Sequence, residues 1–213
     1  MTAIIFYFLT LFSFSKPLAF PFCDDGFAPQ KGEFAFIAFP IPTFSYALSD
    51  RFNFTTACCP LFANLMVFSG IKMSVFSNEK IGISVGGEYL EYAPIFRPEN
   101  YVYAGWSSFS FQKNDITITI SPQVFHIKDF HHSHFEFPLF FSSRAKIIPQ
   151  NCYATIDIFL NIGEKSDYAG IFMGYSLPIW KHIITDAGFF MANQDVGPYI
   201  RLGIKKPAVQ NGD

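Results

Sequence analysis

Apolar and small polar residues alternate along most of this chain, from about Gly32 to its last few residues. The segment Ile116–Ser121 reads ITITIS, which places isoleucines on one face of a strand and hydroxyl residues on the other. The same period of two occurs in Ile81–Glu88, in Tyr153–Ile162 and around Phe135. Helical periodicity is nearly absent from this region. The pattern therefore predicts an all-β fold.

The residues on the second, polar face of the predicted strands favour a barrel over a soluble sandwich. In a soluble sandwich this face meets water and favours long charged side chains, whereas here it carries mainly Gly, Ser and Thr with scattered charges. Such a face fits the crowded lumen of a barrel that is apolar outside and polar inside. The charged residues that the alternation assigns to the lumen are Lys72, Glu88, Glu136, Arg144, Lys146, Asp157, Asp186, Arg201 and Lys205. Their mixed signs predict mutual pairing, in a hydrogen-bonded plug or a narrow pore.

Short and longer connections alternate between the predicted strands, as they do in membrane barrels with short periplasmic turns. The tight turns are predicted at Ser49–Arg51, Asn78–Glu79, Lys113–Asp115, Pro149–Asn151 and Trp180–His182. The longer connections are predicted at Cys59–Ala63, Tyr92–Asn100, Lys128–Ser133, Gly163–Asp167 and Asn193–Pro198. With a first hairpin near Pro40–Pro42, the chain is expected to form an antiparallel up-and-down transmembrane β-barrel of roughly 10–12 strands. The favoured count is about twelve, which puts both termini at the short-turn end.

Bulk composition agrees with an apolar outer surface. Half of the residues are hydrophobic, 29 are Phe and only 15% are charged, against roughly 25% in ordinary soluble domains. No internal stretch approaches the roughly 20 apolar residues of a spanning helix. The net charge of −2 and the lack of a basic stripe argue against nucleic acid as a partner. A secreted soluble barrel or sandwich that binds an apolar ligand is the alternative.

The N-terminus predicts export. Ile4–Phe14 is an apolar run of the length of a signal-peptide core, and Ala19 offers a small residue for cleavage. An N-terminal strand and an uncleaved anchor are the alternatives. We divide the chain into a signal peptide (1–19), a short N-terminal segment (20–32), a β-barrel (33–206) and a C-terminal tail (207–213).

Two segments resemble hairpins of the bacterial outer-membrane β-barrel class. FSYALSDRFNFTT (Phe44–Thr56) is similar to the strand–Asp-Arg–strand hairpins of its periplasmic side, and GIKMSVFSNEKIGISVGGEY (Gly70–Tyr89) is similar in style. The resemblance extends from Gly32 to about Lys206, after which the chain lacks the terminal aromatic residue usual in the class. It implies a Gram-negative outer membrane, contact with the lipid bilayer, insertion by the assembly machinery, and no catalytic residues. The function expected is structural, adhesive or that of a narrow, porin-like pore, without a cofactor.

One cluster, within His126–Glu136, could carry chemistry. The imidazoles of His126, His131, His132 and His134 could bind a divalent metal such as zinc, copper or nickel. Alternatively, His132 or His134 with Ser133 and Glu136 could form the hydrolytic set of an outer-membrane lipid hydrolase. Ser133 lies directly between two histidines, and neighbours on a strand point to opposite faces, which opposes that set. A solvated polar loop is the third interpretation.

The four cysteines do not suggest a metal site. Cys23, Cys58, Cys59 and Cys152 match no metal-ligand spacing. After export, a disulfide could join Cys152 to Cys58 or Cys59. Free buried thiols are the alternative.

Overall fold

The structure of the protein is a computed structural model that describes residues 25–39, 43–61, 64–94, 100–128, 132–147, 152–163, 168–180, 183–192 and 195–206. All regular secondary structure in these ranges is β-strand. Within them, no helix is long and apolar enough to cross a membrane. The predicted signal peptide and C-terminal tail lie outside the described residues.

The strands follow one another along the chain. They are β1 (Phe34–Phe39), β2 (Thr43–Ala47), β3 (Phe52–Leu61), β4 (Asn64–Ser77), β5 (Ile81–Pro94), β6 (Asn100–Lys113), β7 (Ile116–Lys128), β8 (Ser133–Ile147), β9 (Cys152–Gly163), β10 (Tyr168–Trp180), β11 (Ile183–Ala192) and β12 (Asp195–Lys206).

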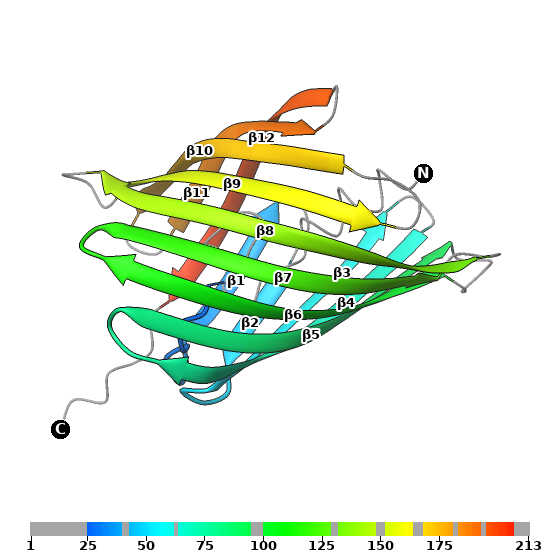
Figure 1. The fold of residues 1–213 in the computed structure, drawn as a ribbon, viewed down its shortest axis with the longest axis horizontal. Coiled ribbons are helices and arrows are strands. Elements are labelled where there is room, and N and C mark those ends of the chain that lie inside the picture. Colours follow the sequence, from blue (N-terminus) through cyan, green and yellow to red (C-terminus); the bar gives the residue numbers. More distant parts are fainter. Residues whose placement is uncertain are drawn as a thin grey trace.

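The twelve strands close into one up-and-down barrel (Figure 1). Each strand pairs antiparallel with its neighbour in sequence, and β1 pairs with β12. Phe34 is the register partner of Lys206, so the start of β1 and the end of β12 lie at the same end of the barrel. This is the end of the β2–β3, β4–β5, β6–β7, β8–β9 and β10–β11 connections, which the sequence predicts as short turns, and we call it the short-turn end. The predicted fold class, an antiparallel barrel of about twelve strands, is confirmed.

Most strands have membrane-spanning length. The strands β4, β5 and β6 have 14 residues each and β8 has 15, whereas about 9–11 tilted residues cross a bilayer. The first two strands are short, with 6 residues in β1 and 5 in β2. The barrel is therefore least extensively paired along β1 and β2, at the β1–β2 and β2–β3 pairs as well as at the β1–β12 seam.

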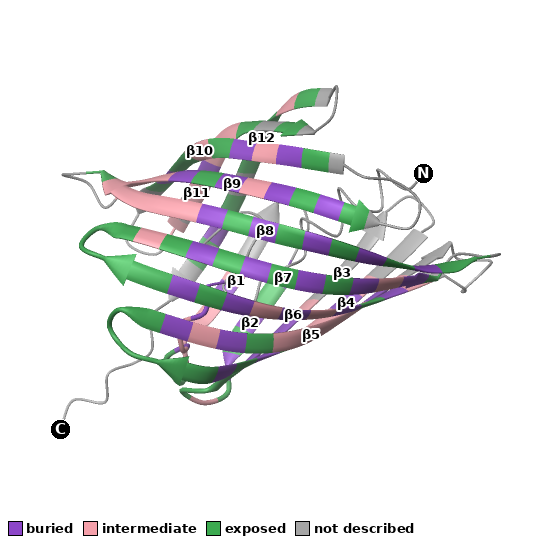
Figure 2. Cartoon of the chain, viewed as in Figure 1, coloured by how far each residue is buried: buried purple, intermediate pink, exposed green. Residues whose placement is uncertain are grey.

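Exposed and buried residues alternate along the strands (Figure 2). Ile118 and Ile156 are 38% and 44% exposed, whereas their neighbours Thr119 and Thr155 are 0% and 3% exposed. Apolar side chains therefore point outward and small polar ones point into the lumen. The faces that the sequence alternation predicts are confirmed for these strands.

The connections lie where the sequence predicts them, but their lengths differ less than expected. The strand β3 continues to Leu61 and β12 begins at Asp195, so the predicted connections Cys59–Ala63 and Asn193–Pro198 consist largely of strand. Pro60 pairs in register with Leu65, and Pro198 pairs with Phe189. Both strands therefore continue past their prolines.

Candidate functional site in the barrel lumen

The charged side chains assigned to the lumen occupy inward-facing positions wherever their side chains are described. Lys72, Glu136, Asp157 and Asp186 are buried, and Glu88, Arg144 and Lys146 are half-buried. Asp186 has Arg201 as its register partner on β12, although the side chains of Arg201 and Lys205 lie outside the described residues. The lumen thus contains charges of both signs.

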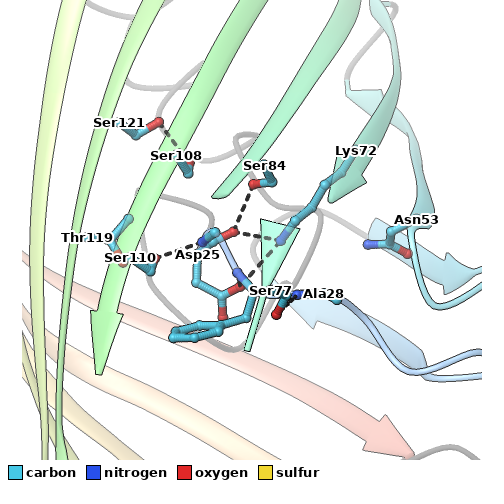
Figure 3. A network of polar contacts seen from close by, with 12 residues as sticks. Asp25, Ala28, Asn53, Lys72, Ser77, Ser84, Ser108, Ser110, Thr119 and Ser121 are labelled. Carbon is cyan, nitrogen blue, oxygen red and sulfur yellow. Dashed lines mark hydrogen bonds and ion pairs between the residues drawn. The ribbon is translucent and has the colours of Figure 1, made fainter. Parts of the chain in front are cut away.

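Residues 25–28, which we call the N-terminal strap, lie inside the barrel against β4, β5 and β6 (Figure 3). The side chain of Lys72 is 0% exposed, and its Nζ donates to the Asp25 carbonyl oxygen at 2.6 Å. The same Nζ lies 3.3 Å from Asp25 Oδ1, and Ser84 Oγ donates to the Asp25 carbonyl at 3.3 Å. A buried ammonium needs such partners, because an unpaired buried charge is strongly destabilising.

Two hydroxyl groups and a glycine of the barrel wall contact the backbone of the strap. Gly26 N donates to Ser110 Oγ at 2.7 Å, and Ala28 N donates to Ser77 Oγ at 3.1 Å. A Cβ on Gly26 would lie 2.1 Å from the carbonyl oxygen of Gly82, and a Cβ on Gly82 would lie 2.5 Å from Gly26 C. The two backbones can approach this closely only because both residues are glycines.

The chain leaves the lumen at the short-turn end. Lys31 N donates to Asp50 Oδ1 in the β2–β3 turn at 2.8 Å, and Gly32 N donates to Ala47 O at 2.9 Å. Gly32 has a φ of 81°, in the left-handed region that favours glycine. These contacts attach the exit of the strap to the rim of the barrel.

A second polar cluster lies on the inner faces of β8 and β9, toward the opposite end of the barrel. His134 Nε2 lies 3.3 Å from Glu136 Oε1, and Asn161 Nδ2 donates to Glu136 Oε2. All three residues are at most 4% exposed. Among the described residues, none makes a hydrogen bond to His134 Nδ1, His134 Nε2, Glu136 Oε1 or Asn161 Oδ1. The cluster therefore combines tight burial with unused hydrogen-bonding capacity.

Two more buried polar atoms without hydrogen bonds lie close to this cluster in the sheet. Phe125 on β7 is the register partner of Glu136, and Gln123 occupies the preceding inward position of β7. Trp106 on β6 is in turn the register partner of Gln123. In the described part of the chain, neither Trp106 Nε1 nor Gln123 Oε1 has a hydrogen-bond partner. These atoms add to the unused hydrogen-bonding capacity of this part of the lumen wall.

The structure does not bring together the histidines that the sequence groups as metal ligands. His126 points outward from β7 and stacks on Phe135, with ring centroids 4.9 Å apart, whereas His134 faces the lumen. His132 is exposed next to the start of β8, and His131 lies outside the described residues. In the described part of the chain, no three His, Cys, Asp or Glu side chains already surround a possible metal position.

The hydrolytic set is likewise not assembled. Ser133 is the exposed first residue of β8, and the alternation of that strand places it on the face opposite His134 and Glu136. A buried hydroxyl that does contact a carboxylate is that of Ser142, which donates to Asp157. The described lumen thus offers a His–Glu pair without Ser133 beside it.

Aromatic side chains line much of the remaining lumen. The buried ones are Phe68, Trp106, Phe125, Phe140, Phe159 and Phe172. A Cβ on Gly86 would lie 2.3 Å from Trp106 Cζ2, and a Cβ on Gly170 would lie 2.1 Å from Phe159 Cε1. The rings of Trp106 and Phe159 therefore each pack against a glycine of the neighbouring strand, which explains Gly86 and Gly170 in these long strands.

The barrel topology argues against the disulfide considered from the sequence. Cys58 and Cys59 belong to β3 and Cys152 belongs to β9, six steps away around the closed sheet. Cys152 is half-buried at the start of β9, while the side chains of the other two lie outside the described residues. The cysteines therefore fall on strands that do not neighbour each other.

Sequence reasoning did not single out Asn161 or Gln123, although the alternation of Tyr153–Ile162 places Asn161 on an inner face. The alternation along β7 and β8 contained a signal that could have identified the His134–Glu136 pair. The outward positions of Ile118 and Ile120 put His126 outward as well, and the outward position of Phe135 puts His134 inward. Strand parity could therefore have separated the histidines and paired His134 with Glu136.

Comparisons with known proteins identify no family. No protein-family model matches the chain, and no curated protein matches it. Among solved structures, LpxR from Salmonella typhimurium is similar, with a TM-score of 0.47 and 8% sequence identity over 83% of this chain and 90% of that chain. A likeness this distant carries no residue role or activity to the present chain.

The class of protein follows from the barrel itself. An even number of antiparallel strands closes completely, with apolar side chains outside and polar side chains inside. This is the architecture of outer-membrane β-barrels. The chain is a β-barrel of that class.

Proposed function

We propose that this chain is an exported outer-membrane barrel of the structural, adhesive or narrow-pore type, closed at its short-turn end by the N-terminal strap. The observation that carries the proposal is the docking of residues 25–28 on Lys72, Ser84 and Ser110. A general porin keeps a water-filled channel through its lumen. Here the chain's own backbone occupies the lumen beside β4–β6.

The outer surface supports a bilayer as the immediate partner. Large apolar side chains are exposed on most strands, including Phe109, Phe137, Ile156, Met173 and Ile200. Soluble monomers rarely expose continuous apolar surface of this kind. This surface supports the proposal that the barrel lies in a bacterial outer membrane, in contact with lipid and inserted by its assembly machinery. The same surface disfavours a secreted soluble protein.

The lipid-hydrolase alternative receives no support from the positions of its residues. Its proposed nucleophile Ser133 lies on the outward face of β8, whereas His134 and Glu136 lie in the lumen. A hydrolytic set requires the nucleophile within hydrogen-bonding reach of its base. The non-enzymatic function remains the one that the site supports best.

The test is the conductance of the full chain in planar lipid bilayers, for the wild type and for Lys72→Met. Methionine retains much of the volume of lysine but leaves the buried Asp25 without its ammonium partner. Breaking a buried ion pair from one side typically costs about 3–5 kcal/mol. We expect little or no steady conductance in the wild type and a clear increase in Lys72→Met, because the strap leaves the lumen.

The matched control is Lys31→Gln. The Lys31 side chain is exposed, and its backbone N–H keeps the bond to Asp50. Lys31→Gln should conduct like the wild type. A wide, steady wild-type channel would contradict the proposal, as would an unchanged conductance in a Lys72→Met barrel that is still folded.

A further inference from the structure

We propose that the buried His134–Glu136 pair binds one divalent transition-metal ion, with His132 as a third ligand. The proposal concerns the end of the barrel opposite the strap. It is independent of whether the lumen conducts.

The first argument is the geometry of the pair. His134 Nε2 and Glu136 Oε1 lie 3.3 Å apart, yet neither atom makes a hydrogen bond within the described part of the chain. An imidazolium–carboxylate pair would align the N–H with the oxygen. Two atoms bound to one tetrahedral zinc ion, with bonds of about 2.0–2.2 Å, are separated by about 3.3–3.5 Å. The observed separation of 3.3 Å matches that of two ligands sharing a metal ion, and it also falls within the distance of an ion pair.

The second argument is the hydrogen bond from Asn161 to Glu136. A carboxylate oxygen can only accept, so the amide nitrogen of Asn161 must face Glu136 Oε2. This bond holds one carboxylate oxygen and leaves Glu136 Oε1 directed elsewhere without a partner. Carboxylates that bind metals are commonly oriented by such a neighbour. Asn161 is therefore a positioning residue for the proposed ligand.

The third argument is the spacing of the ligands along the chain. His132, His134 and Glu136 occur at every second position, and side chains at that spacing lie on one face of a strand. His134 and Glu136 are buried on that face, while His132 is exposed one residue before β8 begins. The described residues contain no preassembled three-ligand group. Binding therefore requires the exposed His132 side chain to turn toward the lumen.

The donor atoms indicate the kind of metal. Imidazole nitrogen together with a carboxylate suits zinc, nickel or copper, whereas calcium and magnesium prefer sites made of oxygen. A carboxylate in an aromatic-lined lumen also favours a cation over a neutral ligand. Phe125, the register partner of Glu136, is 1% exposed and contributes to this apolar surrounding.

The test is metal binding by the full chain, purified in detergent, treated with a chelator and titrated with Zn²⁺ by calorimetry. We expect one equivalent to bind, with Ca²⁺ and Mg²⁺ binding far more weakly. His134→Gln and Glu136→Gln should weaken Zn²⁺ binding at least about tenfold, and Asn161→Ala about 10–100-fold. His132→Gln should also weaken binding. The matched control His126→Gln, on the outer face, should leave the affinity unchanged.

Co²⁺ absorption distinguishes ligand positioning from general damage. The wild type should give the intense visible bands of a tetrahedral site, and Asn161→Ala should alter these bands while retaining the gel-mobility shift of a folded barrel. If a variant does not fold, the wild type still provides a test. Zn²⁺ should then protect one or two histidines of the wild type from acylation by diethyl pyrocarbonate, with His134 among them.

Two results would overturn the proposal. One is the absence of saturable binding at one equivalent, which would leave a plain buried His–Glu pair. The other is binding that survives Glu136→Gln and His134→Gln but is lost in His126→Gln.

Discussion

Thr155 and Ile156 are neighbours in β9, yet they meet opposite environments. Thr155 is 3% exposed in the lumen, whereas Ile156 is 44% exposed on the outer surface. A charge on the outer face is costly in a bilayer, and the cost depends on depth. The position of each residue along its strand therefore determines how well a charge is tolerated there.

Ile156→Arg tests this depth dependence. Ile156 lies inside β9, so we expect the arginine to destabilise the folded barrel by about 2–4 kcal/mol. The control is Ile116→Arg at the first residue of β7, next to a short turn, where the expected cost is about 0–1 kcal/mol. Equilibrium unfolding by urea in lipid vesicles measures both. Equal costs at the two positions would show that the outer face does not span lipid.

Gly86→Ala tests the packing of aromatic rings on glycine. Its Cβ would lie 2.3 Å from the ring of Trp106, so the ring must move and we expect a loss of about 1–3 kcal/mol from overpacking. At the adjacent Gly87 the nearest atom to a Cβ is 3.7 Å away, so Gly87→Ala should change stability by less than about 0.5 kcal/mol. Unfolding followed by tryptophan fluorescence compares the two. A loss at Gly87 equal to that at Gly86 would refute the packing argument.

Among the elements, the strands were predictable from the sequence and the strap was not. Strand alternation such as that of Ile116–Ser121 repeats locally, because each strand must present one face to lipid and one to the lumen. The strap has no such periodicity. Its contacts with Lys72 and Ser110 span 47 and 84 positions of the sequence, and no local pattern encodes them.

The second polar cluster, formed by His134, Glu136 and Asn161, was only partly predictable from the sequence. Strand parity places His134 and Glu136 on one face, but their contact with Asn161 depends on how β8 and β9 are aligned. Glu136 pairs in register with Gly163, which brings Asn161 close enough to donate to it. The alignment depends on the turn between the strands, and the sequence predicted where that turn lies without specifying the register.

Gly26→Ala tests the strap as an element. The added Cβ would lie 2.1 Å from the backbone oxygen of Gly82, which a side-chain rotation cannot relieve, so the strap should leave its site. The amides of Gly26 and Ala28 donate to Ser110 and Ser77 in the docked state. Hydrogen exchange measured by mass spectrometry should therefore show faster deuterium uptake in residues 25–28 of the variant.

Lys31→Gln serves as the control, because the Lys31 side chain is exposed. Exchange in residues 25–28 should match the wild type. Unchanged protection in Gly26→Ala would mean that the close backbone approach to Gly82 does not hold the strap in place.

At the scale of the whole molecule, the main feature is that the sheet closes on itself. The pairing of β1 with β12 leaves no open sheet edge, so every strand has a hydrogen-bonded neighbour on both sides. In a bilayer, backbone groups must pair within the protein, because lipid offers them no partners. The short strands β1 and β2 are extended by contacts of the rim residues Gly32 and Glu33 with Ala47.

The central claim, a closed barrel that spans a membrane, is tested most directly by heat-modifiability. The full chain, extracted in detergent, is run on a denaturing gel with and without boiling. We expect the unboiled protein to migrate differently from the boiled one, because a closed barrel resists the detergent until it is heated. Identical mobility, in a protein that is also soluble without detergent, would contradict the account.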